Sequence, residues 1–281
     1  MTTHRILGIG DNTVDTYVSS RTQYPGGNAV NVAVLARRLG AVTAYMGCLG
    51  DDEGGELVRG ALRAEGVDIS HARTRHGANA RAFVSHDDGD RHFLGSHPGV
   101  RAQYQFTDAD FDYIGEFHLA HTSVYSDLAP VLPRLAASVP LLSFDYSNRW
   151  NTALLANTLP NVGIAFLSGA DLDDIGCERL LETCIGKGAS RAIVTRGSRG
   201  AMGTDGQRIY PQPVLAAKVV DTLGAGDGFI SAFLVAHLDG LPMPDCMRAG
   251  ATFAAEVCGW RGGFGHGQPW DGDGGPPRSL Q

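Results

Sequence analysis

The sequence predicts a three-layer α/β/α fold in which helices cover both faces of a mostly parallel central sheet that carries a small β appendage. Two observations lead to this fold class. Short apolar, strand-like runs alternate with segments of helical periodicity along most of the 281 residues. A hairpin pattern at 80–95 interrupts the alternation, which is typical of a small sheet added to a larger one.

The N-terminal part contains two strand–helix units. RILGIG, at 5–10, precedes NAVNVAVLARRLG, at 28–40, in which Asn28 is a candidate N-cap. VTAYMGCLG, at 42–50, precedes a segment at 52–66 whose apolar residues recur at helical spacing. Each unit places a helix after a strand, as the crossovers of parallel sheets require.

The rest of the chain continues this pattern after the appendage. RAFVSH and RHFLG flank DDGD, which predicts a hairpin with an Asp-Gly turn. Further strand-like runs are FHLAHTS, LLSFDY, VGIAFLS and RAIVT, and a second hairpin is expected from AMGT to QRIYP. Residues 262–281 are so rich in Gly and Pro that we expect a flexible tail after one domain at 1–261.

Composition narrows the class of protein. With 43% hydrophobic residues the chain can bury a sizeable core, and its formal net charge of -7 argues against nucleic acid or an anionic membrane as partner. Lysine occurs only as Lys187 and Lys218, so anions must be held by arginine, backbone amides or a metal. Five scattered cysteines predict buried thiols rather than disulfides or zinc ligands. The absence of a leader or membrane-spanning run predicts a cytoplasmic protein.

The stretch DTLGAGDGF, at 221–229, combines glycines with two carboxylates where a helix is about to start. The amides of Gly224, Ala225 and Gly226 could bind a phosphoryl group at the helix N-terminus, and Asp227 could take a proton from an attacking hydroxyl. Those are the requirements of phosphoryl transfer. A glycine turn with an Asp near a helix start is the alternative, and neither a Walker A loop nor a complete dinucleotide-binding fingerprint is present.

Two motifs make the chain resemble the PfkB (ribokinase-like) carbohydrate kinases. GGNAVNVA, at 26–33, is similar to the family's N-terminal signature, and DTLGAGDGFISAF, at 221–233, to its C-terminal one. The resemblance implies a ribokinase-like fold with a β-lid formed by segments at about 13–24 and 80–95. It also implies ATP and Mg²⁺ as cofactors, possible activation by K⁺, and a possible homodimer through the lid.

Carried over by position, the resemblance assigns roles to individual residues. Asp227 becomes the catalytic base, and the amides of Gly224, Ala225 and Gly226 become the anion hole. The sugar-binding positions are Asp15, Gly26, Gly27, Asn28 and Asn31. The nucleotide-binding positions are Ser168, Thr195, Gly197, Thr222, Gly224 and Gly226. Asp171 would help to hold Mg²⁺, because LSGAD stands where many members have N-x-x-E, and Asp221 and Leu223 would form the monovalent-cation site.

Within the family, the chain is most similar to fructoselysine 6-kinases. GDNTVDTY, at 10–17, adds the carboxylate of Asp11 and the amide of Asn12 near the sugar, which would suit a cationic amine. Arg91, on the lid hairpin, is a further candidate substrate contact, with a solvated hairpin face as the alternative. The expected activity is therefore phosphorylation of a fructosyl-amine at a primary hydroxyl. The alternatives are a kinase for another sugar, a sugar acid or a nucleoside, or a non-catalytic sensor.

Overall fold

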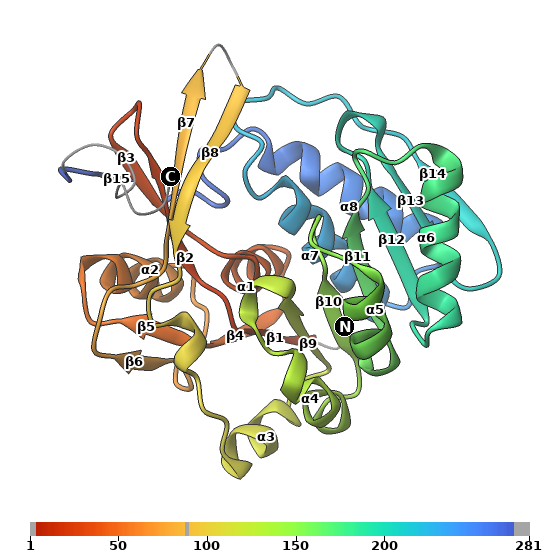
Figure 1. Ribbon diagram of the computed structural model, residues 1–281, viewed down its shortest axis with the longest axis horizontal. Helices are drawn as coiled ribbons and strands as arrows, with labels where there is room; N and C mark the ends of the chain where they lie inside the picture. The colour runs from red at the N-terminus through yellow and green to blue at the C-terminus, as the bar shows by residue number, and fades with distance from the viewer. Residues whose placement is uncertain (1–3, 88–89, 273–281) are drawn as a thin grey trace.

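The structure of the chain is a computed structural model that describes residues 4–87 and 90–272. The main sheet consists of β1 (Arg5–Ile9), β4 (Val42–Met46), β9 (Leu119–Ser123), β10 (Leu142–Asp145), β11 (Ile164–Ser168), β12 (Arg191–Thr195), β13 (Ala201–Thr204) and β14 (Ile209–Gln212). Their order is β14-β13-β12-β11-β10-β9-β1-β4 (Figure 1). The strands from β4 to β12 are parallel, whereas β13 and β14 form an antiparallel hairpin at the edge. The expected mostly parallel sheet is confirmed.

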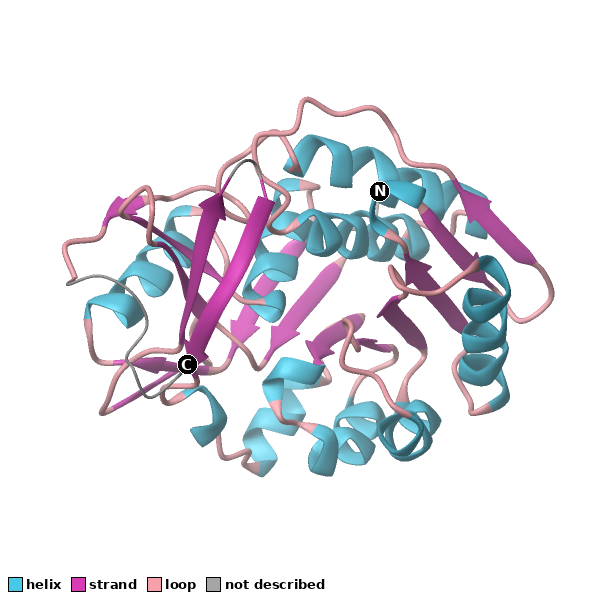
Figure 2. Ribbon diagram, turned by 45° about the horizontal axis from the view of Figure 1, so that its top comes forward, coloured by secondary structure: helices cyan, strands magenta, loops and turns pink. Residues whose placement is uncertain are grey.

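Helices cover both faces of this sheet (Figure 2). They are α1 (Asn28–Arg38), α2 (Glu53–Ala64), α3 (Asp108–Ile114), α4 (Leu132–Ser138), α5 (Thr152–Thr158), α6 (Asp174–Gly186), α7 (Ala225–Leu238) and α8 (Met243–Val257). Helices α3 to α6 pack against Leu7, Phe144 and Leu167 on one face. Helices α1, α7 and α8 pack against Ile6 and Phe166 on the other, because alternate strand residues point to opposite faces. In the described part of the chain, no helix combines the length and apolar character needed to cross a membrane.

A second, smaller sheet stands apart from the main one (Figure 1). Its strands, in spatial order, are β15 (Gln268–Pro269), β3 (Thr22–Gly26), β2 (Thr13–Tyr17), β7 (Arg81–Asp87) and β8 (Asp90–His97). Strand β2 pairs in parallel with β7, which joins the two segments expected to form the lid. The separate pair β5 (Cys48–Gly50) and β6 (Arg73–Arg75) lies beside α2. The β-lid is thereby confirmed, whereas the homodimer through it stays a prediction.

Residues 262–272 differ from the flexible tail that composition predicts. Phe264 is 2% exposed and belongs to the core beneath α1 and α2. The backbone N–H of Gly262 donates a hydrogen bond of 3.0 Å to the Asp221 carboxylate, and β15 pairs with β3. One buried aromatic ring and a few backbone hydrogen bonds are enough to fix a segment that is otherwise poor in apolar residues. Residues 273–281 lie outside the described part of the chain.

We predict that Phe264→Ala lowers the free energy of unfolding by about 3–5 kcal/mol, because it removes a fully buried aromatic ring. Phe93→Ala is the matched control, since Phe93 is 63% exposed and its truncation should cost less than about 0.5 kcal/mol. Urea unfolding of both variants measures the difference. Equal unfolding midpoints would show that residues 262–272 are not part of the folded core.

Candidate active site

The candidate active site lies where the carboxyl ends of β9 and β10 meet the N-termini of α1 and α7. Asn28, the first residue of α1, contacts Asp145 at the end of β10 and Asp227 in the first turn of α7. Ligands of open parallel α/β sheets collect at this edge, where the strands end and the helices begin. Asn28, Asp145 and Asp227 are far apart in the sequence, but each lies at a strand end or a helix start, and these meet at one edge of the parallel sheet.

Two amide groups from α1 hold the Asp227 carboxylate. Asn28 Nδ2 donates to Asp227 Oδ1 over 2.7 Å, and Asn31 Nδ2 donates to Oδ2 over 2.5 Å. Asn28 and Asn31 are three positions apart, so they lie on the same face of the helix. Each carboxylate oxygen has a second lone pair, so Asp227, which is half-buried, can still accept a proton from a ligand hydroxyl.

Asn28 is oriented by a chain of buried hydrogen bonds that includes His121. Asn28 Nδ2 also donates to Asp145 Oδ2 over 3.0 Å, so both of its hydrogens face carboxylates and its Oδ1 must accept. His121 Nε2 lies 2.8 Å from that Oδ1 and is therefore the protonated nitrogen, while Nδ1 faces Ser143 Oγ at 2.7 Å. Burial lowers the pKa of His121 to about 3, which keeps the ring neutral.

Asp11, an expected substrate contact, supports the start of α1. Its carboxylate accepts from the backbone N–H of Asn28 at 2.6 Å and of Ala29 at 3.4 Å. It also accepts from Ser123 Oγ at 2.7 Å and Ser126 Oγ at 2.8 Å. Because Asp11 is 3% exposed and its carboxylate already accepts these four hydrogen bonds, the structure gives the expected contact with a cationic amine no support. Asp11 instead caps α1, whose N-cap residue is Gly27 rather than the expected Asn28.

Asp145 adds a second carboxyl group next to Asp227. Burial raises the pKa of Asp145 to about 7, the backbone N–H of Ser147 opposes this shift, and the charges of Asp227 and Asp11 add to it. Near neutral pH Asp145 is therefore protonated in a substantial fraction of molecules. The protonated form relieves the repulsion between two carboxyl groups that share the Asn28 amide.

The N-terminus of α7 is open toward a ligand. Gly224, its N-cap, has φ +77°, and a Cβ atom there would lie 2.6 Å from the Cα of Gly263. No side chain caps this helix, and a Cβ atom at Gly226 would meet no other atom within 4 Å. The backbone N–H of Ala225 donates to the Thr222 carbonyl over 3.3 Å, so Gly226 is the residue of the glycine-rich motif in α7 whose N–H is available to an anion.

The lid contributes Asp15 to the side that faces α7. Asp15 and Tyr17 lie on the same face of β2, and Tyr17 Oη donates to Asp221 Oδ2 over 2.6 Å. A Cβ atom at Gly26 would lie 2.1 Å from Asp15 Oδ2, so only glycine allows this approach. The Asp221 carboxylate also accepts from Leu223 N at 3.0 Å, which gives it a structural role. The monovalent-cation site at Asp221 and Leu223 stays a prediction.

The expected nucleotide positions lie farther along the same sheet edge. Ser168 and Thr195 are neighbours at the ends of β11 and β12. Gly197 has φ +58° in the turn that follows, and Thr222 and Asp171 are exposed. The described residues contain no group of three His, Cys, Asp or Glu side chains that could hold a metal by themselves.

Two expected substrate contacts receive no support. Asn12 is completely buried, and its Nδ2 donates to Tyr45 Oη at 2.9 Å and to the Cys48 carbonyl at 2.6 Å. Through these bonds the Asn12 side chain connects the segments that follow β1 and β4, while its Oδ1 atom has no hydrogen-bond partner among the described residues. The sugar contact of Asn12 stays a prediction. The side chain of Arg91 lies outside the described residues.

Sequence reasoning missed His121, Ser123 and Ser126 and gave Asp145 no definite role. Their signal was present: polar residues that interrupt or end apolar strands, as in LAHTS and LLSFD, need buried hydrogen-bond partners. What the sequence could not show is which partner each one meets.

Comparison with known proteins identifies the family of this site. The model of the pfkB family carbohydrate kinases matches residues 3–138 and 162–266. Fructosamine kinase FrlD of Bacillus subtilis (strain 168) is 42% identical over 270 residues, which cover 95% of each chain. Fructoselysine 6-kinase of Shigella flexneri is 34% identical over 256 residues, which cover 91% of this chain and 98% of the relative. The chain belongs to the PfkB family and is a carbohydrate kinase.

Solved structures confirm the ribokinase-like fold. Arabidopsis thaliana ribokinase, complexed with ribose and ATP, superposes with a TM-score of 0.81 at 21% identity and covers 94% of this chain and 95% of its own. An Escherichia coli protein provisionally assigned as ribokinase II, in complex with ATP and Mg²⁺, gives a TM-score of 0.80 at 20% identity, with 94% and 95% covered. At these identities the structures show a common fold.

We predict that His121→Leu lowers kcat about tenfold to a hundredfold, because Asn28 loses the donor that fixes its orientation and Asp227 shifts with it. His121→Gln is the matched variant, since its amide N–H can take the place of the imidazole Nε2–H and should retain much more of kcat. Steady-state kinetics of both variants provide the measurement. Equal kcat values in the two variants would contradict a positioning role for His121.

We predict that Asp145 makes the protein less stable as pH rises from 5 to 7. The folded protein holds this proton up to about pH 7, whereas an unfolded Asp releases it near pH 4, so the free energy of unfolding falls by up to about 1.4 kcal/mol per pH unit in between. Urea unfolding at pH 5, 6 and 7 should show this decrease in the wild type relative to Asp145→Asn. The exposed Asp112 serves as a control in Asp112→Asn. Parallel pH curves for the wild type and Asp145→Asn would refute the shift.

Proposed function

We propose that the chain transfers the γ-phosphoryl group of ATP to a primary hydroxyl of a fructosyl-amine, with Asp227 as general base. The observation that carries this proposal is the position of the Asp227 carboxylate. Asn28 and Asn31 hold it in the first turn of α7, at a helix N-terminus that no side chain caps. A base and an anion site next to each other are what direct phosphoryl transfer requires.

The reaction follows from this geometry. Asp227 takes the proton of the substrate hydroxyl as its oxygen forms a bond to the γ-phosphorus, while the bond from that phosphorus to the bridging oxygen breaks and ADP leaves. The N–H groups at the start of α7 stabilise the negative charge on the transferring group. Asp15 and the lid cover the sugar side and exclude water.

The residues near β11 fit a hydrated magnesium ion that binds mainly to ATP. Mg²⁺ usually keeps several waters and takes only one or two carboxylates besides phosphate oxygens. The exposed Asp171, with Ser168 nearby in sequence at the end of β11, can supply such contacts. Bound there, the ion would neutralise phosphate charge.

The fructosyl-amine substrate is supported by the names of the relatives, fructosamine kinase and fructoselysine 6-kinase, which align over nearly the whole chain. The carboxylate of Asp11 no longer supports it, because that group caps α1. The proposed substrate class is therefore supported by similarity to these relatives, whereas the proposed transfer chemistry is supported by the geometry of the site.

We expect Asp227→Asn to lower kcat by about 10²–10⁴-fold, because the variant retains the shape but loses the base. ATP-dependent phosphorylation is measured for fructoselysine, fructosyl-valine, fructose, ribose and adenosine, with Asp112→Asn as a surface control. The fructosyl-amines should give the highest kcat/KM. A preference for ribose or adenosine would overturn the substrate class, and an Asp227→Asn variant with near wild-type kcat would overturn the base.

A further inference from the structure

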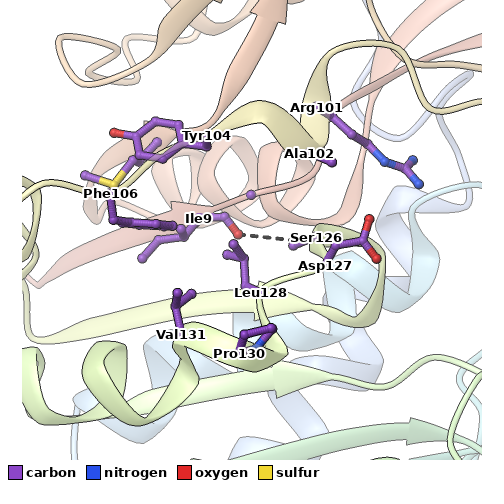
Figure 3. A pocket seen from close by; sticks show the side chains of 12 residues that line it. Ile9, Arg101, Ala102, Tyr104, Phe106, Ser126, Asp127, Leu128, Pro130 and Val131 are labelled. Carbon is purple, nitrogen blue, oxygen red and sulfur yellow. Dashed lines mark hydrogen bonds between the residues drawn. The ribbon is translucent and has the colours of Figure 1, made fainter.

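A cavity of about 120 Å³ lies close to the site, and the proposed transfer chemistry leaves it without a role (Figure 3). Its apolar wall consists of Ile9, Met46, Tyr104, Phe106, Leu128 and Val131. Figure 3 shows Tyr104 and Phe106 at one end and the charged groups of Arg101 and Asp127 at the other. The cavity therefore has an apolar interior with a cation and an anion together at one end.

Hydrogen bonds connect the wall of this cavity to the catalytic base. Ser126, which lines the cavity, donates to Asp11 Oδ1 over 2.8 Å. Asp11 Oδ2 accepts from the backbone N–H of Asn28 at 2.6 Å, and the Asn28 side chain holds Asp227. Asp11 and the start of α1 thus connect the cavity wall to Asp227.

Arg101 lacks the partners that a half-buried guanidinium normally has. Its Nε atom is buried without a hydrogen bond, and none of the described residues forms a hydrogen bond or ion pair with this side chain. A planar guanidinium matches a carboxylate with two parallel hydrogen bonds, and an unpaired buried N–H group is costly. The geometry thus favours a carboxylate ligand at Arg101.

We propose that this cavity binds the amino-acid part of a fructosyl-amino acid. Arg101 pairs with its carboxylate, Asp127 faces the ammonium that joins amino acid and sugar, and the apolar interior takes the hydrocarbon side chain. A volume of about 120 Å³ equals about four water molecules at ~30 Å³ each, which suits a side chain of three or four carbons. This inference rests on the proposed function and adds the residues that would select the substrate.

The test compares two substrates that differ only in the carboxylate, fructosyl-valine and fructosyl-isobutylamine. In the wild type, kcat/KM should be about tenfold to a hundredfold higher for fructosyl-valine, as expected for a charge-assisted pair. Arg101→Gln should bring the ratio of the two kcat/KM values close to one, and Arg101→Lys should give an intermediate ratio. Arg63→Gln, which removes an exposed arginine on α2, should keep the wild-type ratio.

The ratio separates recognition from general damage, because a misfolded variant loses activity on both substrates equally. A wild-type ratio near one, or a ratio that Arg101→Gln leaves unchanged, would overturn the inference while the proposed function stands. If the wild type phosphorylates neither these two adducts nor fructoselysine, the proposed function fails and the inference fails with it.

Discussion

One amide group, that of Asn28, determines the geometry of the candidate active site. Its two hydrogens are shared between Asp227 and Asp145, and its oxygen accepts from His121. An amide between two carboxyl groups cannot rotate without placing its oxygen against another oxygen, so its orientation is strongly fixed. This arrangement buries two acidic groups close together: burial, with a smaller contribution from the charge of Asp227, raises the pKa of Asp145.

The segment that follows α8 connects the lid to the N-terminus of α7. Asp221 receives hydrogen bonds from Tyr17 on the lid, from Gly262 and from Leu223. Gly263 lies directly against Gly224, the residue at which α7 begins. The lid, the helix N-terminus and the C-terminal segment are thus joined around one buried carboxylate.

The sequence predicted the parts of the site that depend on local pattern. Helix starts after strands, glycines before Asp227, and the hairpin of the lid all follow from short-range rules, and the structure contains each of them. The role of Asp11 and the relay through His121 could not be predicted, because a buried polar residue reveals that it needs a partner but not which one. The packing of Phe264 was missed for a similar reason. The high Gly and Pro content of residues 262–281 predicts a flexible tail, and composition does not show that one aromatic residue in it is buried.

The N-termini of α1 and α7 differ in their ability to bind an anion, because the carboxylate of Asp11 lies at the start of α1 only. Both α1 and α7 direct positive dipole ends toward the same region, and either could bind an anion. The carboxylate of Asp11 occupies the start of α1 and neutralises it, whereas no side chain caps α7. An anion is therefore favoured at the start of α7, and α1 presents Asn28 and Asn31 to Asp227. In a chain with only two lysines, this division provides an anion site made of backbone N–H groups next to the Asp227 carboxylate.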